Sequence, residues 1–212
     1  MILQYLFTNP QFFIVWIAAI VYAITVHEFS HALADYRLGD TTARDQGRLT
    51  LNPLAHLDPL GSVMLVLVGF GWGKPVPFNP YSLKNHRWGP AVISLAGPIS
   101  NFVSVIIFGF ALKFLVVGGH LSQDNLLTLF LVALVQVNII LGLFNLIPIP
   151  PLDGSKLLYS ALSDKYIHFK IMLERYGSLI LLAFILLNSF SSVSPLSSIF
   201  TAVTNFVFRI FS

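Results

Sequence analysis

Two histidines and a glutamate, His27, Glu28 and His31, lie within a stretch that is otherwise largely apolar. If this stretch is an α-helix, the two imidazoles are one turn apart on the same face, so both can bind one metal ion. Glu28 then projects about 100° around the helix from His27, where a general base for an attacking water would lie. The spacing predicts a hydrolytic zinc site, although the same five-residue pattern also arises by chance in proteins without a metal.

The composition indicates a membrane protein with several spans. Of the 212 residues, 56% are hydrophobic and only 10% are charged, and the mean hydropathy is +0.79. A soluble domain normally has about a quarter charged residues. The net charge of +3 is explained by loop residues that orient the spans, and no nucleic-acid-binding patch is found. Because cysteine is absent, disulfides and thiolate ligands are excluded, and any metal must take N and O ligands.

We expect an all-α, polytopic fold with about four to six transmembrane segments. Residues 12–33 are long enough to cross a hydrocarbon core of about 30 Å and form the first span. Further spans are expected at 91–117, at 126–147 and at 177–190 with its flank, whereas 199–211 is either an amphipathic helix or a short crossing. One membrane-embedded domain should cover residues 1–212, with a catalytic core at about 12–160 and C-terminal helices at about 171–212.

The apolar stretch 60–72 does not have the length of a full span. It contains about 13 residues, is rich in glycine and is followed by a proline-rich segment. These features favour a re-entrant or β-like stretch between the first two full spans, with a short tilted crossing as the alternative. Basic residues cluster on both sides of it, which places both flanks in the cytoplasm of a multi-pass protein of the cell membrane.

Two histidines leave a zinc ion without its third protein ligand. Asp153 is the best candidate, because it directly follows a predicted span and lies in a break marked by proline and glycine. The alternative is that Asp153 caps the next helix. The spans 91–117 and 126–147 return the chain to the side on which the first span ends, so Asp153 can meet His27 and His31 if residues 60–72 do not cross. The distribution of basic residues in the loops predicts the same topology and places the site near the cytoplasmic face.

Three ordered motifs carry a resemblance to a known family. They are the His-Glu-Phe-Ser-His run at 27–31, Gly-Pro-Ile-Ser-Asn at 97–101 and the stretch 145–154, which ends in Leu-Asp-Gly. Together they resemble the site-2 protease family of intramembrane zinc metalloproteases (peptidase family M50). The stretches 48–59 and 73–77 are similar to its small prokaryotic branch, which lacks PDZ and CBS domains.

The resemblance implies roles for individual residues. Asp153 becomes the third ligand of a single zinc ion and Glu28 the catalytic base, while Asn145 and Asn101 would steady the substrate backbone or the oxyanion. A carboxamide at Asn145 can donate to developing negative charge without adding a net charge, but it could equally bond between helices. His56 could support the site or a gate, or be a loop histidine bonded to the backbone.

The favoured function is intramembrane proteolysis of transmembrane-helix proteins within the lipid bilayer. A substrate helix must unwind locally before cleavage, and an edge strand between residues 60 and 80 could hold it by β-augmentation. A zinc transporter is the main alternative, because buried ligands also mark ion pathways. Transport needs a series of sites, however, and the sequence offers one compact cluster. A purely structural scaffold would leave the burial of Glu28 unexplained.

Overall fold

A computed structural model of the protein describes residues 2–68, 71–190 and 195–211. The regular secondary structure of these residues is helical, and their one β-type pairing is an antiparallel bridge between Leu57 and Gly73. The expected all-α fold is confirmed. The helices are α1 (Ile2–Thr8), α2 (Pro10–Arg37), α3 (Thr42–Asp45), α4 (Pro59–Val68), α5 (Gly89–Leu112, continued by a π-helical turn at Lys113–Val117), α6 (Leu126–Asn145), α7 (Gly154–Ala161), α8 (Ile167–Phe190) and α9 (Pro195–Phe211), with short 3₁₀ turns at Pro53–Ala55, Pro80–Ser82 and Asp164–Tyr166.

Four helices of the described chain are long and apolar enough to cross a membrane. They are α2, α5 with its π-helical turn, α6, and α8 from Ile167 to Asn188. The protein is therefore a multi-pass membrane protein, within the expected range of spans. The last of these helices begins ten residues earlier than the expected start at Gly177, because the basic stretch before it is helical as well.

The helix α9 has 17 residues, slightly fewer than the roughly 20 that a full crossing needs. Its C-terminal end lies against α5, where the ring of Phe211 covers Gly109 and the ammonium of Lys113 donates to the carbonyl of Ile210 (2.9 Å). This end of the chain is thus fixed to the bundle.

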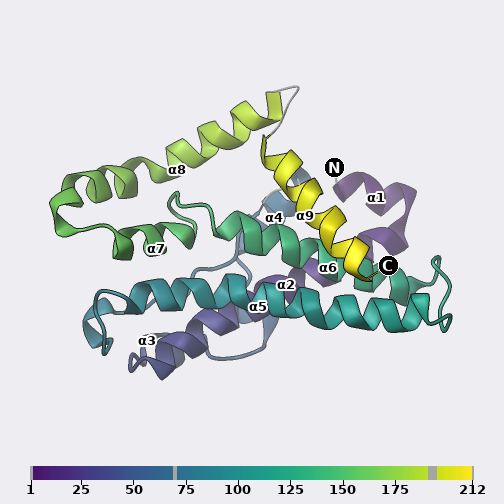
Figure 1. Ribbon diagram of the computed structural model, residues 1–212, viewed down its shortest axis with the longest axis horizontal. Coiled ribbons are helices and arrows are strands. Elements are labelled where there is room, and N and C mark those ends of the chain that lie inside the picture. Colours follow the sequence, from purple (N-terminus) through teal and green to yellow (C-terminus); the bar gives the residue numbers. More distant parts are fainter. Residues whose placement is uncertain (1, 69–70, 191–194, 212) are drawn as a thin grey trace.

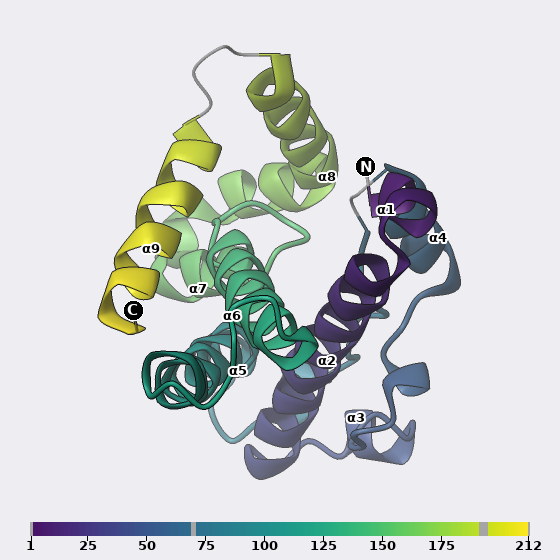
Figure 2. The same ribbon diagram turned by 90° about the vertical axis from the view of Figure 1, so that its right-hand side faces the viewer.

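The centre of the molecule is a bundle of α2, α5 and α6, which all contact one another. Figures 1 and 2 show these helices as neighbours, with α9 across α5 and α6, and α8 projecting away from them. On α2, Ala19 and Ala23 are fully buried in the core with Leu134 of α6. Small residues let membrane helices approach closely, and this approach brings polar groups of the three helices together.

The helix α2 is longer than the predicted span 12–33. It begins at Pro10, where the side chain of Asn9 accepts the N–H of Phe12 as an N-cap, and it ends at Arg37. Its last residues, expected in a polar loop, stay helical because this end of α2 packs against α3. His27 is therefore about 15 Å from the end of the helix, at 1.5 Å per residue.

The two ends of the segment that contains α4 lie next to each other. A Cβ on Gly61, in the first turn of α4, would lie 2.2 Å from the carbonyl oxygen of Trp72, so the returning chain touches the beginning of the helix. Just outside, Lys74 N–H donates to the carbonyl of His56 (2.7 Å) beside the bridge between Leu57 and Gly73. With ten residues, α4 is about 15 Å long, too short for a crossing. A short helix whose returning chain meets its own beginning agrees with the predicted re-entrant stretch; residues 69–70 lie outside the described residues.

One buried carboxylate, that of Asp40, joins the turn after α2 to the segment before α5. Its Oδ1 accepts the N–H (3.0 Å) and the hydroxyl (2.7 Å) of Thr42, and its Oδ2 accepts the N–H of Asn79. Burial alone would raise the pKa of Asp40, but the hydrogen bonds from Asn79 and Thr42 outweigh it and lower the pKa. The ionised carboxylate is the form that holds this connection.

Replacing Asp40 by alanine should lower the free energy of unfolding by about 2–3 kcal/mol, because it removes hydrogen bonds to a charged group. The pKa of Asp40 is lowered in the folded protein. Its contribution to the free energy of unfolding is therefore fully present above the unfolded-state pKa of about 3.9, and it is lost as the pH falls through the folded-state pKa. Thermal unfolding in detergent should therefore give a Tm difference that narrows below about pH 4. Exposed Asp124, changed to alanine, is the control; a difference that persists unchanged in acid would contradict the role of the carboxylate.

Candidate metal centre

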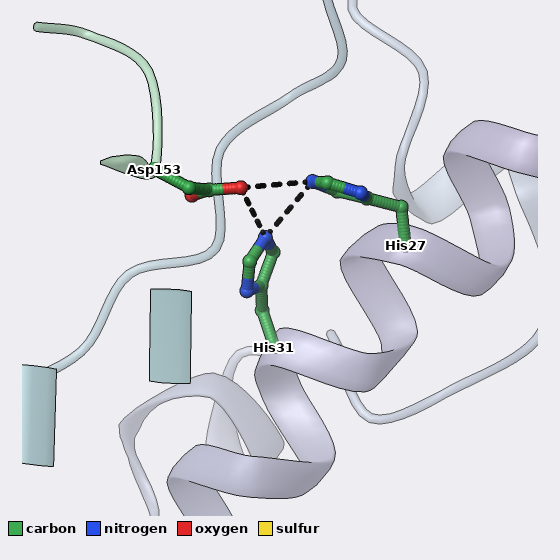
Figure 3. Close-up of side chains that lie close together, drawn as sticks. All are labelled: His27, His31 and Asp153. Carbon is green, nitrogen blue, oxygen red and sulfur yellow. Dashed lines mark hydrogen bonds and ion pairs between the residues drawn. The ribbon is translucent and has the colours of Figure 1, made fainter. Parts of the chain in front are cut away.

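Three potential ligand atoms meet at one point, two from α2 and one from the segment before α7. His27 Nε2 lies 3.0 Å from His31 Nε2 and 3.1 Å from Asp153 Oδ2, and His31 Nε2 lies 3.2 Å from the same oxygen. Figure 3 shows both rings turned toward the carboxylate. Among the described residues, this is the cluster of histidine and acidic side chains that could hold a metal ion.

The tautomer of His31 follows from its second nitrogen. His31 Nδ1 lies 2.7 Å from the backbone carbonyl of Ile93 in α5. A carbonyl oxygen only accepts, so Nδ1 carries the proton and donates it. In the neutral imidazole, Nε2 then offers a lone pair to the cluster.

The tautomer of His27 is set by a chain of amides across three helices. Asn138 of α6 donates its amide N–H to the carbonyl of Leu134 (2.8 Å), which turns its oxygen toward Asn101 of α5. Asn101 donates to that oxygen (2.8 Å) and presents its own oxygen to His27 Nδ1 (2.6 Å). The imidazole must donate there, so Nε2 of His27 also carries a lone pair.

Gly97 of α5 gives the two imidazoles their space. A Cβ at this position would lie 2.5 Å from His31 Nε2 and 2.6 Å from His27 Nε2. Real Cβ atoms do not approach other atoms so closely, so only glycine lets the backbone of α5 lie directly against the cluster. The glycine is part of the resemblance at 97–101, and the structure supplies its steric reason.

Asp153 occupies the N-cap position of α7, but its side chain makes no capping hydrogen bond. The carboxylate points instead to the histidines. The break that carries it folds tightly onto the end of α6, since a Cβ on Gly154 would lie 2.3 Å from the carbonyl oxygen of Leu146.

The donor set fits zinc. Ligand atoms about 2.0–2.1 Å from a tetrahedral ion stand about 3.3 Å apart, close to the separations in this triangle. Two imidazole nitrogens and one carboxylate oxygen are a combination that catalytic zinc sites use, with a further position open to water. Three acceptors that face one another repel unless positive charge lies among them, and a divalent cation supplies it.

Glu28 lies beside this triangle. Its side chain is partly exposed, and it is close enough to His31 for their charges to interact. On its other side is the backbone of Gly73, where a Cβ would lie 3.3 Å from Glu28 Oε1. The carboxylate thus stands between the cluster and the segment that follows α4, as the helical spacing predicts.

The other expected site residues do not join the triangle. Asn101 is fully buried behind His27, with its oxygen and its amide group both engaged. Asn145, the last residue of α6, donates to the carbonyl of Leu141 in its own helix (3.1 Å). His56 is fully buried in its loop, where Nε2 donates to the carbonyl of Thr50 (2.7 Å).

Replacing Asn101 by alanine should weaken zinc binding by about 10- to 100-fold, because His27 loses the acceptor that fixes its tautomer and its ring orientation. Zinc affinity measured by competition with a chelator checks this. Asn101→Asp keeps an acceptor for His27, so its zinc affinity should fall less. Asn125→Ala, at the N-cap of α6, is the control and should bind zinc as tightly as the wild type. Equal affinities of Asn101→Ala and the wild type would remove Asn101 from the support of the site.

Replacing Gly97 by alanine should displace α5 or the two imidazoles and weaken zinc binding about 5- to 150-fold, which corresponds to the 1–3 kcal/mol of an overpacked site. Gly109→Ala is the matched control on the same helix, because its methyl group meets the ring of Phe211 and not the ligands. The measurement is zinc content after dialysis against a graded chelator. Full zinc content in Gly97→Ala would contradict the steric argument.

Comparisons with known proteins agree with this geometry. The model of peptidase family M50 matches residues 15–188. YwhC of Bacillus subtilis, provisionally named a zinc metalloprotease, is 38% identical over 173 residues, which cover 78% of this chain and 77% of that protein. Rip2 of Mycolicibacterium smegmatis, which carries the same provisional description, is 34% identical over 149 residues, or 67% of this chain and 55% of its own length. No solved structure matches the chain.

These relatives give no support to a zinc transporter, since their names describe proteases. The family match extends from the first span to the last one, and so includes both histidines, Glu28 and Asp153. The apolar spans place this chemistry in a membrane. The chain therefore belongs to peptidase family M50 and is an intramembrane zinc metalloprotease.

Proposed function

We propose that this protein hydrolyses peptide bonds within or near the transmembrane helices of membrane-protein substrates, with His27, His31 and Asp153 as the ligands of one zinc ion. The observation that carries the proposal is the triangle of ligand atoms, because two of its members belong to a helix long and apolar enough to span a membrane. The whole chain would act as one membrane-embedded domain, with its catalytic core at about 12–160.

Glu28 acts as the general base and then as the general acid. Zinc, when bound, supplies a Lewis acid that polarises the scissile carbonyl and makes water a stronger acid. Glu28 accepts the proton of the attacking water on its carboxylate and delivers a proton to the nitrogen of the leaving amine. Its side chain is partly exposed, so water can reach the carboxylate.

The three remaining site residues act without binding the metal. Asn101 keeps His27 in the tautomer that binds zinc. Asn145 uses one amide N–H on Leu141, and its second N–H is the donor to the developing oxyanion. His56 holds the loop after α3 together through Thr50.

The substrate has to give up its helical hydrogen bonds before cleavage, because a helix shields its own backbone. The extended chain around residue 73, which bridges to Leu57, lies beside Glu28. A locally unwound substrate would pair there in the manner of an added strand.

The active site lies near the cytoplasmic face of the cell membrane. Basic residues cluster at the end of α2 and in the segments around α4, which return to the same side. By the positive-inside rule this side is cytoplasmic. The crossings α5 and α6 then bring Asp153 back to the same face.

Glu28→Gln should retain zinc and lose cleavage of a membrane-spanning test substrate by about 10²–10⁴-fold, because the amide does not accept the proton of the water. Purified variants are assayed for bound zinc and for cleavage in parallel. Asp153→Ala should instead lose bound zinc. The zinc content therefore distinguishes the loss of a metal ligand from the loss of the base. Glu174→Gln, a change of the only other glutamate in the chain, is the matched control. Cleavage by Glu28→Gln at the wild-type rate would contradict the role of Glu28 as general base.

A further inference from the structure

A buried arginine stands close to the proposed catalytic base and has no part in the mechanism above. Arg48, in the loop after α3, is only 4% exposed. Its Nη1 donates to the carbonyl of Pro75 (2.9 Å), and its Nη2 donates to the carbonyl of Lys74. The guanidinium thus binds two consecutive backbone carbonyls. Within the described part of the chain, no carboxylate lies within ion-pair distance of it.

The segment held by Arg48, residues 73–75, is the segment that touches Glu28. Lys74 N–H donates to the carbonyl of His56, so the segment is held both by the bridge and by the guanidinium. At its first residue, a Cβ would lie 3.3 Å from Glu28 Oε1 and 3.1 Å from Ile24 Cγ2 of α2. The two carbonyls bound by Arg48 therefore directly follow the residue that lies against the base.

The charges of Arg48 and Glu28 also act on each other. Burial lowers the pKa of Arg48, and the negative charge of Glu28 acts in the opposite direction and favours the cation. A buried cation without a close ion pair is costly and needs other compensation. Here the two carbonyl dipoles and the charge of Glu28 provide it.

We propose that Arg48 is a positioning residue for peptide hydrolysis, which clamps residues 73–75 against Glu28 and so fixes the wall along which the scissile peptide lies. The inference rests on the proposed role of Glu28 as the base. Arginine suits the task because its planar fork reaches two adjacent carbonyls at once, whereas a lysine ammonium is a point charge on a flexible stem. The clamp acts on geometry, since a displacement of about 1 Å near the reacting atoms costs about 100-fold in rate.

Arg48→Lys tests the fork while it keeps the charge. We expect kcat for a membrane-spanning test substrate to fall about 10- to 100-fold, with KM nearly unchanged and with zinc content and Tm like those of the wild type. Arg44→Lys makes the same chemical change at an exposed arginine that pairs with Asp45, and it should cleave normally. Wild-type kcat in Arg48→Lys would overturn the proposal.

A second measurement reads the position of the segment without any activity. The chain has no cysteine, so the pair Ile24→Cys and Gly73→Cys supplies the only two thiols. With Arg48 present the pair should form a disulfide readily under mild oxidation, because the two positions are in contact. With Arg48→Lys the disulfide should form more slowly. Equal rates in the two backgrounds would overturn the clamp.

The two measurements separate the failure of this inference from that of the proposed function. If the wild type does not cleave the substrate, the assigned function fails, and the disulfide rates still decide whether Arg48 fixes the segment. If the wild type cleaves and Arg48→Lys loses its folded thermal transition, Arg48 is a general anchor of the fold, and its role as a positioning residue is overturned.

Discussion

Mutual repulsion among three electron-pair donors is the constraint on which the rest of the structure depends. The lone pairs of His27 and His31 and the carboxylate of Asp153 stand 3.0–3.2 Å apart in a largely buried place. In water such groups would turn away from one another. Here hydrogen bonds at the Nδ1 atoms hold both imidazoles in place. The carbonyl of Ile93 and the amide oxygen of Asn101 fix the two ring protons on the far side, so the facing atoms need a cation between them to offset the repulsion.

The membrane explains why this support comes from helices. Without water in the hydrocarbon core, each polar group needs a partner from the protein, and the buried amides of Asn101 and Asn138 satisfy each other across α5 and α6. Close packing makes this possible, since Ala19 and Ala23 keep α2 near α6 and Gly97 brings α5 against the imidazoles. The same contacts that hold the bundle together therefore orient the ligands.

Much of the site could be predicted because its logic is local or topological. The helical period pairs His27 with His31, and counting crossings brings Asp153 to the same side. The amide chain and the steric role of Gly97 depend on how far each helix is rotated about its axis, which apolar periodicity in a lipid-facing bundle does not determine. For Arg48 the sequence predicts only a topological charge within a family-like stretch, because a basic loop residue in a membrane protein is normally a topological signal, and only the folded loop shows that it is buried.

The bond pattern at Asp153 has a consequence for the whole chain. His27 and Asp153 are 126 positions apart, so an ion bound to both acts as a reversible cross-link that closes a very long loop between the first span and the segment after the third. Loop closure of this length costs only slightly more than closure of a shorter one, because the entropy grows with the logarithm of length. By mass action, free zinc at about 100 times its dissociation constant adds about 2.7 kcal/mol to the folded state. A metal bound by these residues would thus also help to keep the helices assembled.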